Sequence, residues 1–208
     1  MSINVCNDRS MASITSLPSG VSGSSLVLIK TLTASGDNEL DFNDGSSDVV
    51  LDSTYKEYIF KFINMHASND GTGFAINLRT GSSGSYSAAT KTTTFFVASH
   101  NENDGATSLG YDTGDDLAQS TGDVTLTGGN VGNGNDESVS GEMHLFNPSS
   151  TTFVKHFIAR SNINSSDDKA RNHFIAGYAN TTSAITSVRF KMVAGTLDSG
   201  TVKLYGVS

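Results

Sequence analysis

The side chains best suited to chemistry in this chain are acidic residues gathered in two turn-like stretches. Asp41-x-Asn43-Asp44-Gly45 and Asp112–Asp116 each place carboxylate and amide oxygens close together. Such oxygen ligands suit a hard cation such as Ca²⁺. Neither stretch has the D-x-[DN]-x-[DN]-G spacing and the distal Glu of an EF-hand loop. The spacing favours solvated aspartates that form turns. We therefore predict no metal and no cofactor, and calcium in these loops stays the open alternative.

Histidines are the next group that could bind a metal ion. His144, His156 and His173 fall in or beside segments with strand-like patterns, and His144 and His156 are expected to face each other across a hairpin. A zinc site needs a third ligand placed nearby. The sequence has no HxH or HExxH pair to supply one. These histidines are predicted to pack in the fold or lie on its surface.

The other reactive side chains do not have the spacing that catalysis requires. There is no G-x-S-x-G elbow for a serine nucleophile, and Cys6 lies in a Ser- and Gly-rich N-terminal stretch. Glu137 and Glu142 flank a predicted central strand, but pairs of acids occur by chance in any acidic protein. Gly128–Gly134 lacks the lysine and the following helix of a phosphate-binding loop. We predict that the chain is not an enzyme and has no catalytic residue.

Two tyrosines and one histidine are the candidates for contact with a ligand or a partner. Tyr86 and Tyr111 lie among Gly, Ser, Asn and Asp, a mixture typical of loops that contact carbohydrate or protein, because Tyr offers rigid contact area. The competing interpretation is that both are ordinary loop aromatics packed on the core. His156 is placed on the face of a predicted hairpin that is open to a partner subunit.

That hairpin, Gly141–Arg160, is the clearest structural element in the sequence. Its two apolar runs, Met143–Phe146 and Phe153–Ile158, are separated by a turn that contains Pro148. Proline lacks an N–H and rarely sits inside a central strand. One face of the hairpin is predicted to be core, through Phe153 and Phe157.

Short alternating runs separated by Asn/Asp/Gly turns recur along the rest of the chain. The further predicted strands are 25–33, 38–42, 49–51, 55–66, 74–80, 90–99, 124–126, 173–178, 186–193 and 201–207. Residues 55–80 are expected to form one hairpin, 162–169 a polar loop and 195–200 a turn, and 101–140 is the least regular part. Roughly nine to eleven short strands without an amphipathic helix indicate an all-β antiparallel sandwich or barrel.

Composition limits the partners and the domain organisation. The formal net charge of −8 argues against wrapping nucleic acid and against docking on an anionic membrane. The single Cys6 cannot form an internal disulfide. Residues 1–24 are predicted to be an extended arm with a turn at Leu17-Pro18, which either packs on a neighbouring subunit or frays. Residues 25–208 are predicted to form one β-sandwich domain. No targeting segment is visible, so synthesis in a cytoplasm is expected.

Three runs resemble virion structural proteins of tailed phages, especially marine and cyanobacterial phages. They are residues 52–64 (DSTYKEYIFKFIN), 141–148 (GEMHLFNP) and 198–207 (DSGTVKLYGV), and their order extends the resemblance over about residues 25–208. The resemblance implies a jelly-roll-like β-sandwich, a homotrimer and a place on the particle surface. Because these motifs are structural, they carry over no catalytic residue.

The resemblance implies one of two roles on the particle. The first is a capsid decoration (cement) protein that stabilises the head and binds the major capsid protein or another virion protein. The second is a receptor- or glycan-binding module of a tail fibre or tail appendage. The short chain lacks the heptads or repetitive shaft of a self-standing fibre, which favours decoration.

Overall fold

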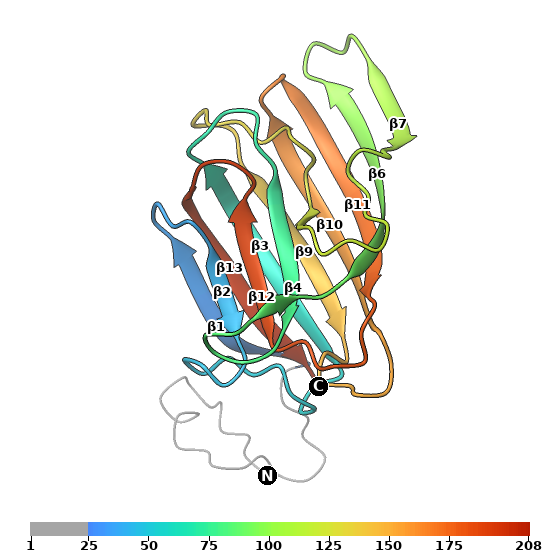
Figure 1. Cartoon of the computed structure of the whole chain (residues 1–208). Helices are drawn as coiled ribbons and strands as arrows, with labels where there is room; N and C mark the ends of the chain where they lie inside the picture. Colours follow the sequence, from blue (N-terminus) through green and yellow to red (C-terminus); the bar gives the residue numbers. More distant parts are fainter. Residues whose placement is uncertain (1–24) are drawn as a thin grey trace, which may run out of the picture.

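The computed structural model describes residues 25–208, which form two antiparallel β-sheets packed face to face (Figure 1). The strands are β1 (Leu26–Ala34), β2 (Leu40–Asn43), β3 (Glu57–Ala67), β4 (Phe74–Thr80), β5 (Ser87–Ala88), β6 (Lys91–Asn101), β7 (Thr107–Tyr111), β8 (Val124–Thr125), β9 (Val139–Phe146), β10 (Lys155–Ser165), β11 (Lys169–Ala179), β12 (Ser187–Met192) and β13 (Leu197–Val207). The predicted all-β sandwich is confirmed. Within this described part, no helix is long and apolar enough to cross a membrane.

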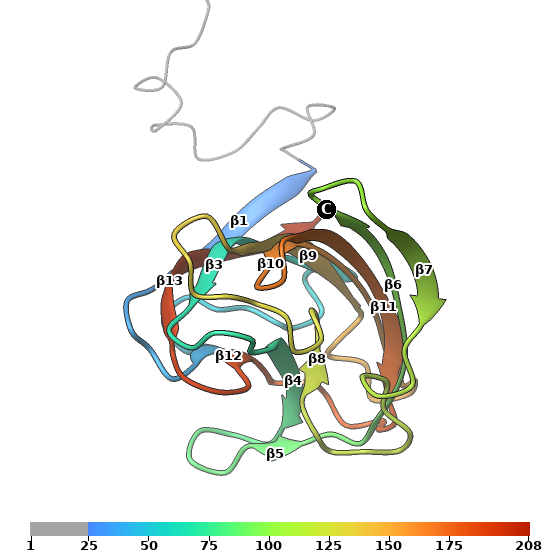
Figure 2. The same cartoon turned by 90° about the horizontal axis from the view of Figure 1, so that it is seen from above.

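The two sheets differ in size and shape. The larger sheet has eight strands in the order β1-β13-β3-β9-β10-β11-β6-β7, and the smaller one has the order β2-β12-β4-β5, with β8 also paired to β4. The larger sheet curves around the smaller one, so its concave inner face covers the core and its convex outer face points away (Figure 2).

Aromatic side chains from both sheets fill the core. The predicted alternation of 55–66 is confirmed, because Tyr58, Phe60 and Phe62 on β3 are all fully buried. From the smaller sheet, Phe190 on β12 lies 5.5 Å from Phe60, and Phe74 on β4 lies 5.3 Å from Phe62, measured between ring centres. Such tilted and edge-to-face aromatic contacts hold the two layers together.

The central hairpin forms, with a longer connection than predicted. β9 and β10 pair antiparallel, and β10 begins only at Lys155. Phe157 is buried in the core as predicted, but the prediction for Phe153 is wrong because its side chain is 69% exposed. Phe153 precedes the strand, in a loop where the two-residue alternation of a strand does not apply. Sequence composition alone did not separate this loop from the strand that follows it.

The predicted hairpin of residues 55–80 is also wrong. β3 pairs with β13 and β9 in the larger sheet, whereas β4 pairs with β12, β5 and β8 in the smaller one. The turn at Asn69-Asp70-Gly71 therefore joins two layers instead of two neighbouring strands. Turn residues of this kind allow the chain to reverse its direction locally. They do not determine which sheet contains the next strand.

Three boundary predictions need correction as well. Most of the predicted loop 162–169 belongs to the long β10–β11 hairpin, and β13 starts at Leu197 inside the predicted turn 195–200. Residues 49–51 are not a strand, although Val49 and Leu51 are buried. Within the irregular stretch 101–140, β7 adds an edge strand that the sequence did not indicate.

Candidate functional sites

The outer face of the larger sheet carries a continuous row of side chains that crosses seven strands. The antiparallel registers place the following residues next to one another in this order: Lys203, Lys61, Glu142, Arg160, Phe174, Phe96 and Tyr111. Residues aligned across neighbouring strands on one face touch their neighbours. The row therefore begins with charged residues on β13, β3 and β9 and ends with aromatic residues on β11, β6 and β7.

The aromatic end of this row belongs to a wider apolar area, which we call the aromatic half of the outer face. Its members are Phe96, Leu109, Tyr111, Phe146, His156, Ile158, Phe174 and Tyr178. The rings of Phe96 and Phe174 stack with centres 5.2 Å apart, and the guanidinium carbon of Arg160 lies 5.0 Å from the Phe174 ring centre. Ile158 is 53% exposed and Phe96 39% exposed.

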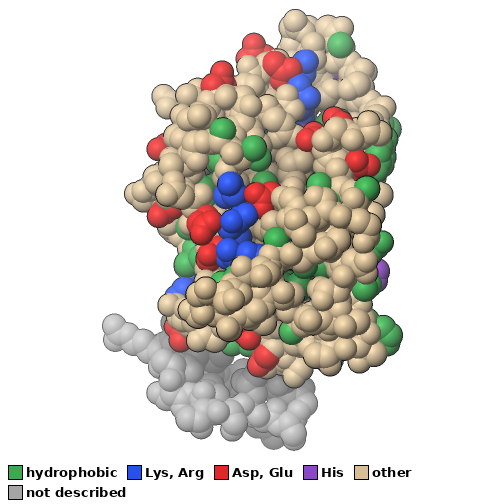
Figure 3. All heavy atoms as spheres, in the orientation of Figure 1, with side chains coloured by type: hydrophobic (Ala, Val, Ile, Leu, Met, Phe, Trp, Pro, Cys, Tyr) green, Lys and Arg blue, Asp and Glu red, His purple; other side chains and the backbone are tan. Residues whose placement is uncertain are grey.

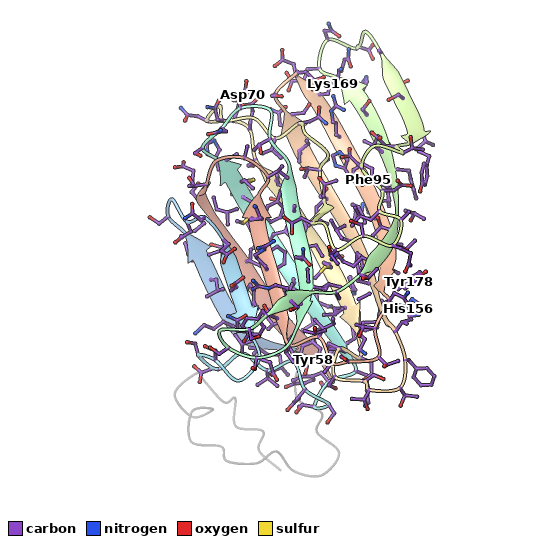
Figure 4. The ribbon with its side chains drawn as sticks, viewed as in Figure 1. Tyr58, Asp70, Phe95, His156, Lys169 and Tyr178 are labelled. Atoms are coloured by element: carbon purple, nitrogen blue, oxygen red, sulfur yellow. The ribbon has the colours of Figure 1, made fainter. Side chains whose placement is uncertain are left out.

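A shallow depression of about 490 Å³ lies within the aromatic half. Phe146, His156, Ile158 and Tyr178 stand around it, and the small side chain of Ala176 contributes to its lining. The His156 and Tyr178 rings are 6.1 Å apart, and Figure 4 shows them side by side on the outer side of the larger sheet. Its lining combines aromatic rings with small and aliphatic side chains.

On the same face, beside the aromatic half, lie charged side chains that pair with one another, and we call this area the charged half. Lys61 Nζ lies 3.7 Å from Glu142 Oε2, and His144 Nδ1 lies 2.5 Å from Glu57 Oε1. These groups are part-exposed, where ion pairs contribute little to folding stability. These paired charges lie between the aromatic half and the exposed Leu26 and Leu28 of β1 at the other edge of the sheet.

The outer face of the smaller sheet is occupied by cations with acidic partners. Arg79 pairs with Asp41 at 2.5 Å, and Arg189 lies 2.6 Å from Asp123 and 3.4 Å from Glu39. Figure 3 shows Lys and Arg side chains gathered over this sheet with Asp and Glu beside them. Because these charges satisfy one another, this face offers few free groups to an anionic or cationic partner.

A buried lysine connects this network to the core. Lys91, the first residue of β6, is fully buried, and its Nζ donates to Asn77 Oδ1 at 2.9 Å, to the Ala89 carbonyl at 2.7 Å and to the Thr121 carbonyl at 3.4 Å. Asn77 Nδ2 in turn donates to Asp123 Oδ1 at 2.6 Å. Burial lowers the pKa of Lys91 to about 8, against the opposing attraction of Asp123.

Sequence reasoning missed Lys91, although the sequence contains a signal for it. Lys91 has the same parity along β6 as Phe95, whose side chain is buried in the core. A lysine on the core side of a strand requires buried acceptors. Its acceptors come from β4 and from the loop before β8, so only the folded chain identifies them.

The three candidate contact residues do not form one site. Tyr111 and His156 both lie on the outer face of the larger sheet, where the Tyr111 hydroxyl donates to Asp116 at 2.6 Å. Tyr86 lies beside the smaller sheet, with the Arg79 guanidinium 5.3 Å from its ring centre. Leu17 and Pro18, which were predicted to belong to an interface arm, lie outside the described residues.

The acidic turn stretches use their oxygens within the chain. Asp44 accepts from the Leu51 backbone N–H and Asp112 from that of Gly114. Across residues 25–208, no three His, Cys, Asp or Glu side chains are grouped to hold a metal ion.

The histidines lie elsewhere than their predicted pairing requires. In the β9–β10 register His144 faces Ile158, so the prediction that it faces His156 is wrong. His173 is buried on the inner face of the larger sheet and contacts the Ser161 hydroxyl. A pair of His144 and His156 would require a register that differs by two residues. In the observed register, Ile158 takes the place opposite His144.

Comparison with protein-family models, curated proteins and solved structures finds no match to this chain.

Proposed function

We propose that this chain is a non-enzymatic structural protein of a tailed-phage virion, and that it works as a homotrimeric capsid decoration (cement) protein with a jelly-roll-like sandwich. The observation that carries this proposal is the aromatic half of the larger sheet's outer face. It exposes Ile158, Phe96 and Tyr111 together, and no part of residues 25–208 covers them. The resemblance of three sequence runs to phage virion proteins supports the same class.

The physical basis is the burial of apolar surface between subunits. Removing apolar surface from water contributes roughly 25 cal/mol per Å². A specific interface buries on the order of 800 Å² on each partner, with aromatic residues enriched at its centre. Here the aromatic half supplies that centre, and the charged half supplies a polar rim with Lys61 and Glu142. Binding to the assembled lattice alone then stabilises the lattice by mass action.

Association is tested with a pair of variants matched in exposure. Ile158 on the outer face is 53% exposed and Val193, beside the smaller sheet, is 59% exposed. We expect Ile158→Lys to convert the trimer to monomer in sedimentation velocity, because it places a charge inside the interface. Val193→Lys is expected to remain trimeric. A wild-type protein that is monomeric at all concentrations contradicts the trimer.

Two experiments test the role on the particle: one locates the protein on intact particles, and the other examines particles that lack it. Imaging of intact particles is expected to show hundreds of copies on the head, in keeping with a lattice of capsid subunits. Particles that lack the protein are expected to release their contents at a lower temperature and under milder osmotic shock. Equal resistance of complete and deficient particles overturns the stabilising role, and a few copies at the tail overturn the location.

The second candidate is a receptor- or glycan-binding module of a tail appendage, and one observation favours it. Tyr86 borders a polar depression of about 500 Å³ that is also lined by Asn43, Asp44 and Thr186. An aromatic ring beside hydroxyl, amide and carboxylate groups suits a sugar. This candidate predicts binding of host glycans that Tyr86→Ala weakens, and absence of binding on a host-glycan array at high protein concentration removes it.

A further inference from the structure

An amine, a primary amide and a carboxylate meet where the two sheets come together. Lys91 stands on β6 of the larger sheet and Asn77 on β4 of the smaller sheet, and Asp123 lies just before β8. The Lys91 amine is 2.9 Å from Asn77 Oδ1, and the Asn77 amide nitrogen is 2.6 Å from Asp123 Oδ1. Lys91 is 0% and Asn77 2% exposed, so the contact is enclosed.

We propose that Lys91 and Asn77 react within the folded chain to form an isopeptide bond that joins β6 to β4. Nζ of Lys91 attacks Cγ of Asn77, a bond forms between these two atoms, and the bond from Cγ to Nδ2 breaks. Starting from the ammonium form, Lys91 gives up two protons and the amide nitrogen leaves as an ammonium ion. Charge and atoms balance, and no oxidant or added reactant is required. This crosslink does not depend on the proposed virion role.

The surroundings of Lys91 favour its nucleophilic form. A lysine attacks only as the neutral amine, which burial promotes. Burial is the main cause that lowers the pKa of Lys91 to about 8, and the positive charge of Arg189 lowers it further while Asp123 raises it. The Ala89 and Thr121 carbonyls accept hydrogen bonds from Nζ. In the neutral amine these two acceptors take its two N–H groups, which leaves the lone pair for Asn77.

Asp123 contacts the nitrogen that leaves in this reaction, with its Oδ1 2.6 Å from Asn77 Nδ2. Hydrogen bonds from Asn77 and Arg189 hold the pKa of Asp123 below its usual value, although burial opposes them. The ionised carboxylate therefore places a negative charge beside the nitrogen that must leave. This negative charge stabilises the positive charge that develops on Nδ2 as it takes the two protons released by Lys91 and leaves as an ammonium ion.

A second buried lysine supplies an internal control. Lys155 is also fully buried, but its Nζ donates only to the Phe153 and Thr181 backbone carbonyls. No side-chain amide is among its hydrogen-bond partners. The proposal therefore predicts a crosslink at Lys91 and none at Lys155 in the same molecule.

Mass spectrometry of the purified full chain tests the crosslink directly. We expect an intact mass lower by one ammonia molecule. In a tryptic digest, cleavage after Lys91 is expected to be lost, the free peptide 80–91 to be absent, and residues 62–79, which contain Asn77, to be linked to a peptide that contains Lys91. Cleavage after Lys155 is expected to be normal. A wild-type chain of full mass with Lys91 cleaved overturns the proposal.

Two controls separate the crosslink from other losses of ammonia and from misfolding. A succinimide at Asn133-Gly134 also removes one ammonia, but it leaves Lys91 cleavable. Asp123→Asn keeps the size of the side chain and removes the negative charge beside Asn77 Nδ2, so we expect a folded chain by circular dichroism with full mass. Crosslinking that persists in Asp123→Asn overturns the role given to Asp123.

The time course supplies a test that uses no variant. Wild-type chain kept unfolded in denaturant from synthesis is expected to have full mass, and transfer to folding conditions is expected to start the loss of ammonia. The rate is expected to rise with pH up to about pH 8, as Lys91 loses its proton, and to level off above it. A loss of ammonia that proceeds equally in denaturant overturns a reaction organised by the fold.

Discussion

The two faces of the larger sheet differ sharply, as the alternating residues of β10 show. Its inward residues, among them Phe157 and Ile163, are buried against the smaller sheet, while Ile158 on the outward side is 53% exposed. Both sets contain large apolar side chains. The inner set is covered by this chain itself, and the outer set has no cover from residues 25–208.

This difference separates folding from association. Apolar burial on the inner face contributes to the free energy of folding of one chain, whereas the outer aromatic half contributes only when another surface covers it. Titratable groups follow the same division. His173 is enclosed on the inner face, while His156 stands beside Tyr178 on the outer one. Substitutions on the two faces should therefore give different readouts.

The largest expected effect comes from two adjacent residues of β10. Phe157→Ala leaves a cavity in the core and is expected to lower the free energy of unfolding by about 3–5 kcal/mol. Ile158→Ala removes only part-exposed surface and is expected to change the monomer's stability by less than about 1 kcal/mol. Denaturant unfolding of both variants at a concentration where the chain is monomeric provides the measurement. Equal losses for the two would remove the distinction between the faces.

A pH titration of stability tests the enclosure of His173. Burial, aided by the nearby Arg171 charge, lowers the pKa of His173 to about 4. The folded-state pKa is thus below the unfolded value of about 6.5, so the unfolded chain binds this proton first. The contribution of neutral His173 to the free energy of unfolding is fully present above about pH 6.5 and is lost as the pH falls to about 4. The loss amounts to about 3 kcal/mol.

The contribution of His173 is isolated by comparison with His173→Gln. Asp167 also loses stabilising ionisation in acid, because its hydrogen bonds with Lys169 and Ser165 lower its pKa. That contribution is common to both proteins. The difference in their unfolding free energies between pH 7 and pH 4 therefore reports His173. If the two pH profiles are parallel, the imidazole is not enclosed as described.

Local alternation made the inner face of the strands predictable. The pattern of Tyr58, Phe60 and Phe62 identified a buried side of β3, and the pattern of Val188, Phe190 and Met192 identified one of β12. Such periodicity reports which side of a strand is covered. It does not report which strand lies alongside, and for this reason β3 and β4 were joined into one hairpin although they lie in different sheets.

The candidate sites were less predictable because they depend on register. The row from Lys203 to Tyr111 exists only when seven strands are aligned, and a shift by one residue moves a side chain to the other face. His156 and Tyr111 were selected as contact residues from their types and surroundings, and both are exposed on the outer face. The hydrogen bonds of Asn77 with Lys91 and with Asp123 join three segments of the chain, and no local pattern encodes them.

The smallest expected effect tests whether the outer face has a structural role of its own. Arg160 donates to Asn172 at 3.1 Å and lies over the Phe174 ring. A cation over an exposed ring contributes about 0.5–1 kcal/mol. Arg160→Ala is therefore expected to lower the monomer's unfolding free energy by no more than about 1 kcal/mol, and Arg160→Lys, which keeps the charge, by less. Thermal and denaturant unfolding of both variants give the values. A loss comparable to that of Phe157→Ala would mean that the outer face stabilises the single chain, and the division between a folding face and a binding face would not hold.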